Sequence, residues 1–276
     1  INGFSYRLDR HPTMSKHPIT PMDESDLLKH LANQTNLTSE SIDVLSLDGD
    51  EKSLYLHYES IQEKIVLFDT ITNDHLLIIG KLITLNWKQR NQLLVGSSAV
   101  ENALFAQDAT SKLDFEKAGK ASKMLVISGS CSPVTATQIK YAEQKGFHTL
   151  AIDAVKLLNE NERTMEILRI QNIVSGRLQS NNPVICYSAL GFEDPSVNQV
   201  KNIEGGQEKL PVVLGELLKG LIEKTKPDRV VAAGGDTSGK ITQLLEIESL
   251  EFLMPLAPGA PMCIACLLYT SDAADE

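Results

Sequence analysis

The sequence is poor in basic side chains, aromatic rings and cysteine. Its 276 residues carry 26 Lys and Arg against 36 Asp and Glu, a formal net charge of −10, and only 5% of them are aromatic. A protein that binds a phosphate backbone needs a basic face, so this composition argues against nucleic acid as a partner. The four cysteines, at positions 131, 186, 263 and 266, are too few and too scattered for a disulfide framework. We therefore expect a reducing, cytoplasmic compartment.

Only one uncharged stretch, residues 252–271, has the length of a membrane-spanning helix. Pro255, Pro258 and Pro261 interrupt it, and each proline removes a backbone donor that lipid cannot replace. We expect no membrane segment, and we predict a strand followed by a turn-rich loop in this stretch.

Both ends of the chain lack features of a natural terminus. Ile1 is preceded by no Met and followed by no signal-peptide pattern, so we expect that the natural start lies upstream. Residues 266–276 resemble an in-frame translation of a sequencing-library adapter. We expect them to be a non-native tail, and for that reason we do not interpret the C-x-x-C spacing of Cys263 and Cys266 as a redox or metal half-site.

Short apolar runs alternate with segments of helical spacing, and the length suits two domains. The first domain is expected at 1–117 and the second at 118–265. Strands are expected at 42–48, 64–69, 92–96, 124–127, 147–153, 183–189 and 229–233, and helices at 24–34, 73–81, 135–145, from Pro211, and at 240–246. The alternation predicts an α/β fold of two Rossmann-like, three-layer domains with mostly parallel sheets.

Two turns rich in Gly, Ser and Thr follow predicted strands and precede predicted helices. They are Ser128 to Ser132 and Gly234 to Gly239. Ligands of parallel sheets bind beyond the carboxyl ends of the strands, where helix N-termini present free N–H groups, and glycine lets the backbone approach phosphate oxygens. A tight turn with no ligand is the alternative for either one alone, but two in one domain favour phosphate binding.

The second turn also fits the G-x-x-x-x-G-K spacing of a P-loop, ending at Lys240. The next residue is Ile241, where a P-loop needs a Ser or Thr hydroxyl to hold Mg²⁺, so a P-loop hydrolase is only a weak alternative. Asp236 could act through Mg²⁺, through a nucleotide hydroxyl, or as the N-cap of the following helix.

Each remaining candidate residue also has a purely structural explanation. His11 and His17 each precede a proline and lack a third ligand with convincing spacing, so we predict no metal site. They could shape a loop near the domain cleft, with Arg7, Arg10 and Lys16 as carboxylate partners, or belong to an ordinary solvated basic loop. Cys131 could be an activated thiol at a helix N-terminus, or a small packing residue.

Five segments in order resemble landmarks of the four-carbon acid sugar kinase family. They are residues 8–22, 95–98, 127–132, 233–239 and 255–261. The resemblance implies a two-domain α/β kinase that transfers the γ-phosphate of ATP to a hydroxyl of a threonate, erythronate or 3-oxo-tetronate type of sugar acid. The N-terminal domain would hold the sugar acid and the C-terminal domain the nucleotide.

The resemblance also implies site residues. The nucleotide contacts would be Ser130, Ser132, Gly234, Gly235, Asp236, Thr237, Ser238 and Gly239, with ATP and Mg²⁺ as cofactors and no identifiable Mg²⁺ ligands. The sugar acid or the domain cleft would be lined by Arg10, His11, His17, Ser97 and Ser98, although a helix N-cap explains the last two equally well.

Two family features have no counterpart in the chain: an acidic N-terminal motif, expected to supply the catalytic base, and a final glycine-containing loop. We therefore expect the chain to be a fragment of a kinase and to be inactive by itself. The kinase could form a homo-oligomer. A non-catalytic, nucleotide-binding regulatory module is the alternative.

Overall fold

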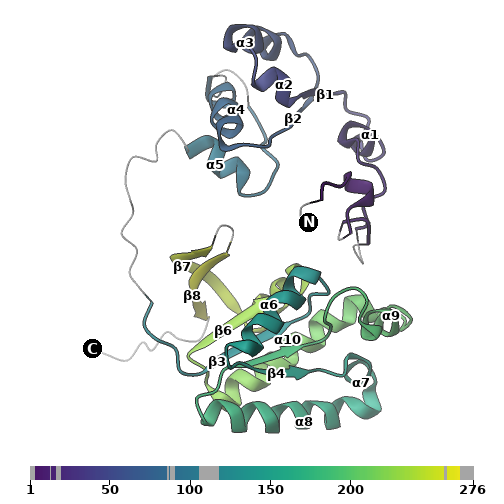
Figure 1. Ribbon diagram of the computed structural model, residues 1–276, viewed down its shortest axis with the longest axis vertical. Helices are drawn as coiled ribbons and strands as arrows, with labels where there is room; N and C mark the ends of the chain where they lie inside the picture. Colours follow the sequence, from purple (N-terminus) through teal and green to yellow (C-terminus); the bar gives the residue numbers. More distant parts are fainter. Residues whose placement is uncertain are drawn as a thin grey trace. The chain divides into compact units, whose positions relative to one another are not determined.

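The chain divides into two compact units, Ile1–Phe115 and Glu116–Glu276, which are described separately (Figure 1). The computed structural model describes residues 4–12, 14–16, 20–85, 87, 91–105, 118–257 and 260–267. The expected domain boundary at residue 117 lies outside these ranges.

The first unit is built mainly of helices around a short parallel strand pair. Its elements are η1 (Leu8–Arg10), η2 (Met14–Lys16), α1 (Leu27–Ala32), β1 (Ser39–Ile42), α2 (Val44–Leu47), α3 (Glu51–Ser60), β2 (Ile65–Phe68), α4 (Asn73–Leu85) and α5 (Ala99–Phe105). Strands β1 and β2 pair in parallel from Ser39 opposite Ile65 to Ile42 opposite Phe68. The core gathers Ile42, Leu47, Leu54, Ile61, Ile79, Leu82, Ile83 and Ala103.

The second unit is a parallel sheet covered by helices. Its elements are β3 (Met124–Ser128), α6 (Pro133–Gln144), β4 (His148–Ala151), α7 (Ala154–Leu158), α8 (Glu160–Gln179), β5 (Val184–Tyr187), α9 (Pro195–Lys201), α10 (Gly206–Thr225), β6 (Arg229–Ala233), α11 (Gly235–Leu244), β7 (Ile247–Ala257) and β8 (Ala260–Leu267). The sheet has the strand order β4-β5-β3-β6, and every neighbouring pair is parallel. All four carboxyl ends therefore meet at one edge.

The main core of this unit lies between one face of the sheet and helices α8, α10 and α11. Alternate residues of β3, Leu125 and Ile127, point into it and meet Ile170 of α8, Leu214 of α10 and Ile241 of α11. Helix α6 contributes no side chain to this cluster, although Ala136 and Ile139 are buried elsewhere. This packing covers one face of the sheet. The carboxyl edge of the sheet is formed by the turns that follow the strands.

The α/β class and the mostly parallel pairing are confirmed, but two expected strands in the first unit are wrong. The strand expected at 42–48 ends at Ile42, because the Asp43 side chain accepts a hydrogen bond from the Ser46 amide and starts helix α2. The strand expected at 92–96 does not form: Leu94 packs against the core of the first unit, but its neighbours Leu93 and Val95 are 89% and 87% exposed.

Three further expectations in the second unit need correction. Helix α10 begins at Gly206 and contains Pro211, since the chain is already helical where the Lys209 amide donates to Gly205. Helix α11 begins at Gly235, not at Lys240. The turn-rich loop expected after β7 is strand β8, which pairs antiparallel with β7 and places Pro255 opposite Pro261. In a two-stranded hairpin both strands are edges, where proline is tolerated.

Among the described residues, no helix combines the length and the apolar composition that crossing a membrane requires.

Candidate functional site

The two glycine-containing turns lie side by side at the carboxyl edge of the sheet. Strands β3 and β6 are neighbours in register, with Ser128 opposite Ala233. The Gly129 amide continues the pairing by donating to the Ala233 carbonyl at 3.0 Å. Two turns that are separated by about a hundred residues of sequence thus lie at neighbouring strand ends.

Glycine is required at two positions because the turns touch. A β-carbon on Gly129 would overlap the hydroxyl of Thr237, and one on Gly234 would lie 3.3 Å from that hydroxyl and 3.4 Å from the Ser130 amide nitrogen. Gly234 also has a φ of 116°, in the region that favours glycine. Thr237 is only 3% exposed, so it fills the space between the turns and does not face solvent.

The second turn is the first turn of a helix. Gly234 is the N-cap of α11, and residues 235–239 are helical, so the amides of Gly235, Asp236 and Thr237 belong to the helix start, where no intrahelical acceptor is available. The Ser238 hydroxyl donates to the Gly234 carbonyl at 2.8 Å and lies along its own backbone. Gly239 is exposed in the second helical turn.

The serines of the first turn hold its shape. The hydroxyls of Ser130 and Thr135 are 3.0 Å apart, and the Ser132 amide donates to the Ser130 hydroxyl at 3.2 Å. The Ser132 hydroxyl caps α6 by accepting from the Val134 amide at 3.3 Å. Burial raises the pKa of the Cys131 thiol above its ordinary value, which contradicts the interpretation of this residue as an activated thiolate.

Two interpretations of the second turn are wrong. Asp236 is not the N-cap, because Gly234 occupies that position; its exposed carboxylate has no hydrogen-bond partner among the described residues. Residues 235–239 also do not form the phosphate-wrapping loop of a P-loop, and the Lys240 ammonium donates to Gln243 one turn on, at 3.2 Å. Ile241 lies in the core.

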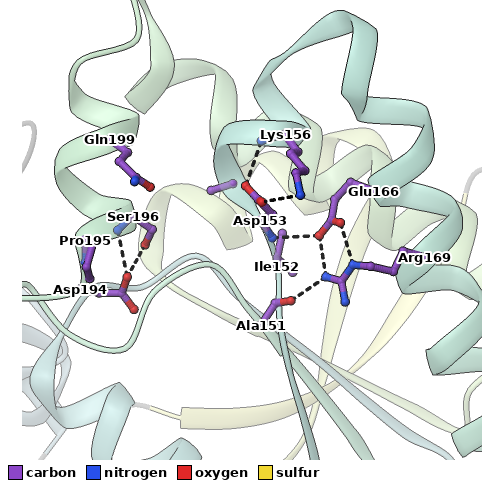
Figure 2. A pocket seen from close by; sticks show the side chains of 11 residues that line it. Ala151, Ile152, Asp153, Lys156, Glu166, Arg169, Asp194, Pro195, Ser196 and Gln199 are labelled. Carbon is purple, nitrogen blue, oxygen red and sulfur yellow. Dashed lines mark hydrogen bonds and ion pairs between the residues drawn. The ribbon is translucent and has the colours of Figure 1, made fainter.

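A pocket of about 430 Å³, which the sequence did not predict, lies at the same edge of the sheet (Figure 2). Its walls come from the end of β4, the starts of α7 and α9, and α8. Ser188, which follows β5, joins it to the first turn: its amide donates to the Ser128 carbonyl at 3.0 Å, and its own carbonyl accepts from the Ser196 hydroxyl at 2.8 Å.

The pocket contains a buried carboxylate with a full set of partners. Glu166 is 3% exposed and accepts from the Asp153 amide at 2.9 Å and from the Arg169 guanidinium at 2.6 and 2.7 Å. This hydrogen bonding raises the pKa of Arg169. Arg169 also donates to the Ala151 carbonyl at 2.8 Å, which ties α8 to the end of β4. An i, i+3 pair of Glu and Arg was the only sequence signal for this arrangement.

The candidates of the first unit occupy two different elements. Arg10 ends η1 and lies 3.6 Å from the Asp9 carboxylate, and the ring of His11 accepts from the Met14 amide at 3.2 Å. The carbonyls of Ser97 and Ser98 accept from amides of α5, at Val100 and Asn102. His17 lies outside the described residues. Within the described ranges, no three His, Cys, Asp or Glu side chains cluster in a way that could hold a metal ion.

A parallel α/β sheet with two glycine turns and a helix N-terminus at its carboxyl edge defines a class, the domains that bind phosphate-containing ligands at strand ends. The comparisons with known families agree. The model described as a nucleotide-binding C-terminal domain matches residues 125–275, and the one described as a sugar-binding N-terminal domain matches residues 2–104. The chain belongs to the four-carbon acid sugar kinase family.

Two curated relatives illustrate the range of similarity. The chain is 36% identical over 281 residues to a 3-oxo-isoapionate kinase from Paraburkholderia graminis. The matched region covers 96% of this chain and 59% of that protein. The chain is 25% identical over 262 residues to a 3-oxo-tetronate kinase from Brucella melitensis, with 90% and 57% covered. The chain thus spans less than two thirds of these relatives.

Two solved structures share the fold. A Salmonella typhimurium LT2 protein described as a tRNA synthase superposes with a TM-score of 0.66 at 24% identity, covering 93% of this chain and 60% of that one. The Haemophilus influenzae protein HI1011 superposes with a TM-score of 0.54 at 20% identity, covering 91% and 60%. The nucleotide contacts expected among residues 130–132 and 234–239 stay predictions.

Proposed function

We propose that this chain is part of an ATP-dependent kinase that phosphorylates a hydroxyl of a small sugar acid. The observation that carries the proposal is the contact between the Gly129 turn and the start of α11, in the unit that the nucleotide-binding model matches. Each turn alone has a purely structural explanation. Together they bring backbone amides and a helix N-terminus to neighbouring strand ends, which suits a chain of phosphates.

The residues present fit ATP and Mg²⁺. Gly129 and Gly234 let the two turns pack closely around the Thr237 side chain. A β-carbon on Gly235 would meet nothing within 4 Å, so phosphate oxygens could approach the amides at the start of α11. The exposed carboxylate of Asp236 is an oxygen ligand of the kind that Mg²⁺ prefers. Phosphoryl transfer needs mainly positioning and charge neutralisation. The amides would position the phosphates, and Mg²⁺ held by Asp236 would neutralise their charge.

The sugar acid would bind to the first unit, which the sugar-binding model matches. The relatives are named for 3-oxo-isoapionate and 3-oxo-tetronate, so we propose a 3-oxo sugar acid of this size as the acceptor. Arg10 has an exposed guanidinium that suits a carboxylate. A cytoplasmic location and a homo-oligomeric state remain predictions.

Calorimetry and an ADP-release assay test the proposal together. We expect the 276-residue chain to bind Mg²⁺-ATP and to release no ADP, with or without sugar acid. A protein extended to the length of its relatives should release ADP only when a 3-oxo sugar acid is present. ADP release by the extended protein at the same rate with and without the sugar acid would contradict the proposal. Nucleotide binding without turnover in the extended protein would favour the regulatory module.

A further inference from the structure

The pocket beside β4 and β5 shares the carboxyl edge of the sheet with the two glycine turns. Strand β5 lies between β4 and β3, so the pocket is one to two strand spacings from the first turn, and neighbouring strands are about 4.8 Å apart. The hydrogen bonds from Ser128 through Ser188 to Ser196 run along this edge and connect the turn to the pocket wall. One ligand molecule could therefore reach both places.

The charges in the pocket disfavour an anionic ligand. Its lining holds three carboxylates, on Asp153, Glu166 and Asp194, and two cations, on Lys156 and Arg169. Both cations already have anionic partners: Lys156 lies 3.2 Å from Asp153, and Arg169 lies 2.6 Å from Glu166. A phosphate or carboxylate group would find no unpaired positive charge among these residues and would be repelled.

The same lining suits an uncharged ligand that carries hydroxyl groups. An ionised carboxylate has about four acceptor sites. Asp194 uses two of them, for the Leu190 amide at 2.8 Å and the Ser196 amide at 3.0 Å. One of its oxygens also lies 2.7 Å from the Ser196 hydroxyl, whose single hydrogen it shares with the Ser188 carbonyl. Asp153 accepts from the Lys156 amide at 3.1 Å and pairs with its ammonium. Both carboxylates retain capacity for a hydroxyl donor.

The remaining lining can hold a flat, partly apolar ring. Ile152, Ala154 and Pro195 add apolar surface, and Gln199 offers an amide that both donates and accepts. In Figure 2 the Gln199 side chain extends from α9 toward the side of the pocket that carries Asp153. Hydroxyl acceptors, apolar surface and an amide are the groups that a ribose and its base require.

We propose that this pocket binds the nucleoside half of the nucleotide whose phosphates lie on the two glycine turns. The inference rests on the proposed function, because it presupposes that the turns bind phosphate. Asp153 and Asp194 would accept from ribose hydroxyls, and Gln199 would contact the base edge. An acidic residue at the end of a following strand has this role in dinucleotide-binding sheets.

Binding measurements with three probes test the assignment: ATP, adenosine and inorganic tripolyphosphate, titrated into the 276-residue chain by calorimetry. Gln199→Trp places a bulky ring over the pocket from an exposed helical position. Asn198→Trp, one residue away on the same helix, exposed and outside the lining, is the matched control. Asp153→Asn is a second pocket variant, since Asn still caps α7. Circular dichroism checks that each variant folds.

We expect Gln199→Trp to weaken ATP about tenfold or more and to abolish adenosine binding, while tripolyphosphate stays within about twofold. Asn198→Trp should leave all three probes unchanged, and Asp153→Asn should weaken ATP about threefold without affecting tripolyphosphate. An unchanged ATP affinity in both pocket variants would overturn the pocket assignment and leave the proposed function standing. Tighter tripolyphosphate binding to Asp153→Asn would overturn it as well, since it would place phosphate in the pocket. Failure of the unmodified chain to bind either ATP or tripolyphosphate would overturn both proposals.

Discussion

Single residues control how closely the two turns approach. Gly129 has no room for a β-carbon because the buried Thr237 side chain, stiff at χ1, occupies the space, with a Leu214 methyl carbon 3.1 Å away. Gly235, at the start of α11, has nothing within 4 Å of a built β-carbon. Of these two glycines in neighbouring turns, only Gly129 is required for steric reasons.

Gly129→Ala should lower the free energy of unfolding by about 1–3 kcal/mol, because the added methyl group overpacks the contact with Thr237. Gly235→Ala is the matched control, and we expect it to be neutral or to stabilise by up to about 1 kcal/mol, since alanine favours the helix. Urea unfolding measures both. Equal effects of the two variants would contradict the role of Gly129 as the contact between the turns.

The roles of Asp236 and Lys240 separate the kinase proposal from a P-loop hydrolase. Asp236→Ala should weaken Mg²⁺-ATP binding about tenfold, because it removes the exposed carboxylate at the start of α11. Lys240→Ala should change it by less than about twofold, because its ammonium pairs with Gln243. Calorimetry with and without Mg²⁺ measures both effects. The reverse ranking would support the hydrolase.

Asp194 should make stability depend on pH. Burial raises the pKa of its carboxyl, but hydrogen bonds from Ser196 and Leu190 outweigh this effect and hold the pKa below its ordinary value. A carboxyl with a lowered pKa stabilises the folded state above its unfolded pKa of about 3.9, and this contribution is lost as pH falls through the folded pKa.

Asp194→Ala should therefore cost about 1 kcal/mol at pH 7, and less as the pH falls below about 4. Asp194→Asn should cost less at pH 7, since an amide oxygen also caps α9. Urea midpoints across this pH range give the comparison. A cost for Asp194→Ala that grows with acidification would show that the sign is wrong.

At the scale of elements, helix α8 depends on one charged side chain as well as on its apolar stripe. Its buried positions are Glu166, Ile170, Val174 and Leu178, one helical turn apart. Glu166 joins the helix to the end of β4 and to the start of α7 through Arg169 and the Asp153 amide. The Glu166 carboxylate is buried while the Arg169 side chain is 42% exposed, so the loss of Glu166 affects the Asp153 amide more than the arginine.

Glu166→Ala should destabilise the second unit by about 1–3 kcal/mol, because it leaves the Asp153 amide without an acceptor and removes the partner of the Arg169 guanidinium. Glu162→Ala, at an exposed position of the same helix, should cost about 0.5 kcal/mol or less. Chemical denaturation followed by circular dichroism distinguishes them. A small effect of Glu166→Ala would mean that the ion pair is dispensable for the packing of α8.

Helix α8 also shows why sequence patterns found some elements and missed others. Strands β3, β5 and β6 are mostly apolar runs with two adjacent β-branched residues each, and they were predicted within about two residues. Helix α8 was missed because Glu166 interrupts the apolar spacing on the buried face. The expected strand at 42–48 failed because local capping by Asp43 outweighed the apolar pattern.

The candidate site was only partly readable from the sequence. Each glycine turn has a local signature, but their contact depends on β3 and β6 being neighbours, which the strand order β4-β5-β3-β6 decides and no local pattern encodes. The pocket was missed because its lining comes from separate elements, α7, α8 and α9 together with the end of β4. Tertiary packing brings these together.

For the whole molecule, the two hydrophobic cores are separate. All residues of one cluster lie between 42 and 103, and all those of the other lie between 125 and 241. The single tryptophan, Trp87, belongs to the first unit. Its fluorescence therefore reports the unfolding of one unit only, while circular dichroism reports both.

Ile42→Ala should lower the urea midpoint of Trp87 fluorescence, while Ile170→Ala should leave it unchanged and shift the dichroism transition of the second unit. Both isoleucines are fully buried, and each truncation should cost about 2–5 kcal/mol in its own unit. A shift of the Trp87 midpoint by Ile170→Ala would show that the units unfold as one.

The central place of β3 has a consequence for how the chain folds during synthesis. Strand β3 is the first strand of its sheet to be made, yet its partners are β5 and β6, so both of its edges stay open until those later segments leave the ribosome. Strand β1, by contrast, pairs with β2, the next strand along the chain. Pairing between distant segments is slow because a long loop must close first. The first unit should therefore fold early, and the second should remain open to chaperones until Arg229–Ala233 has been added.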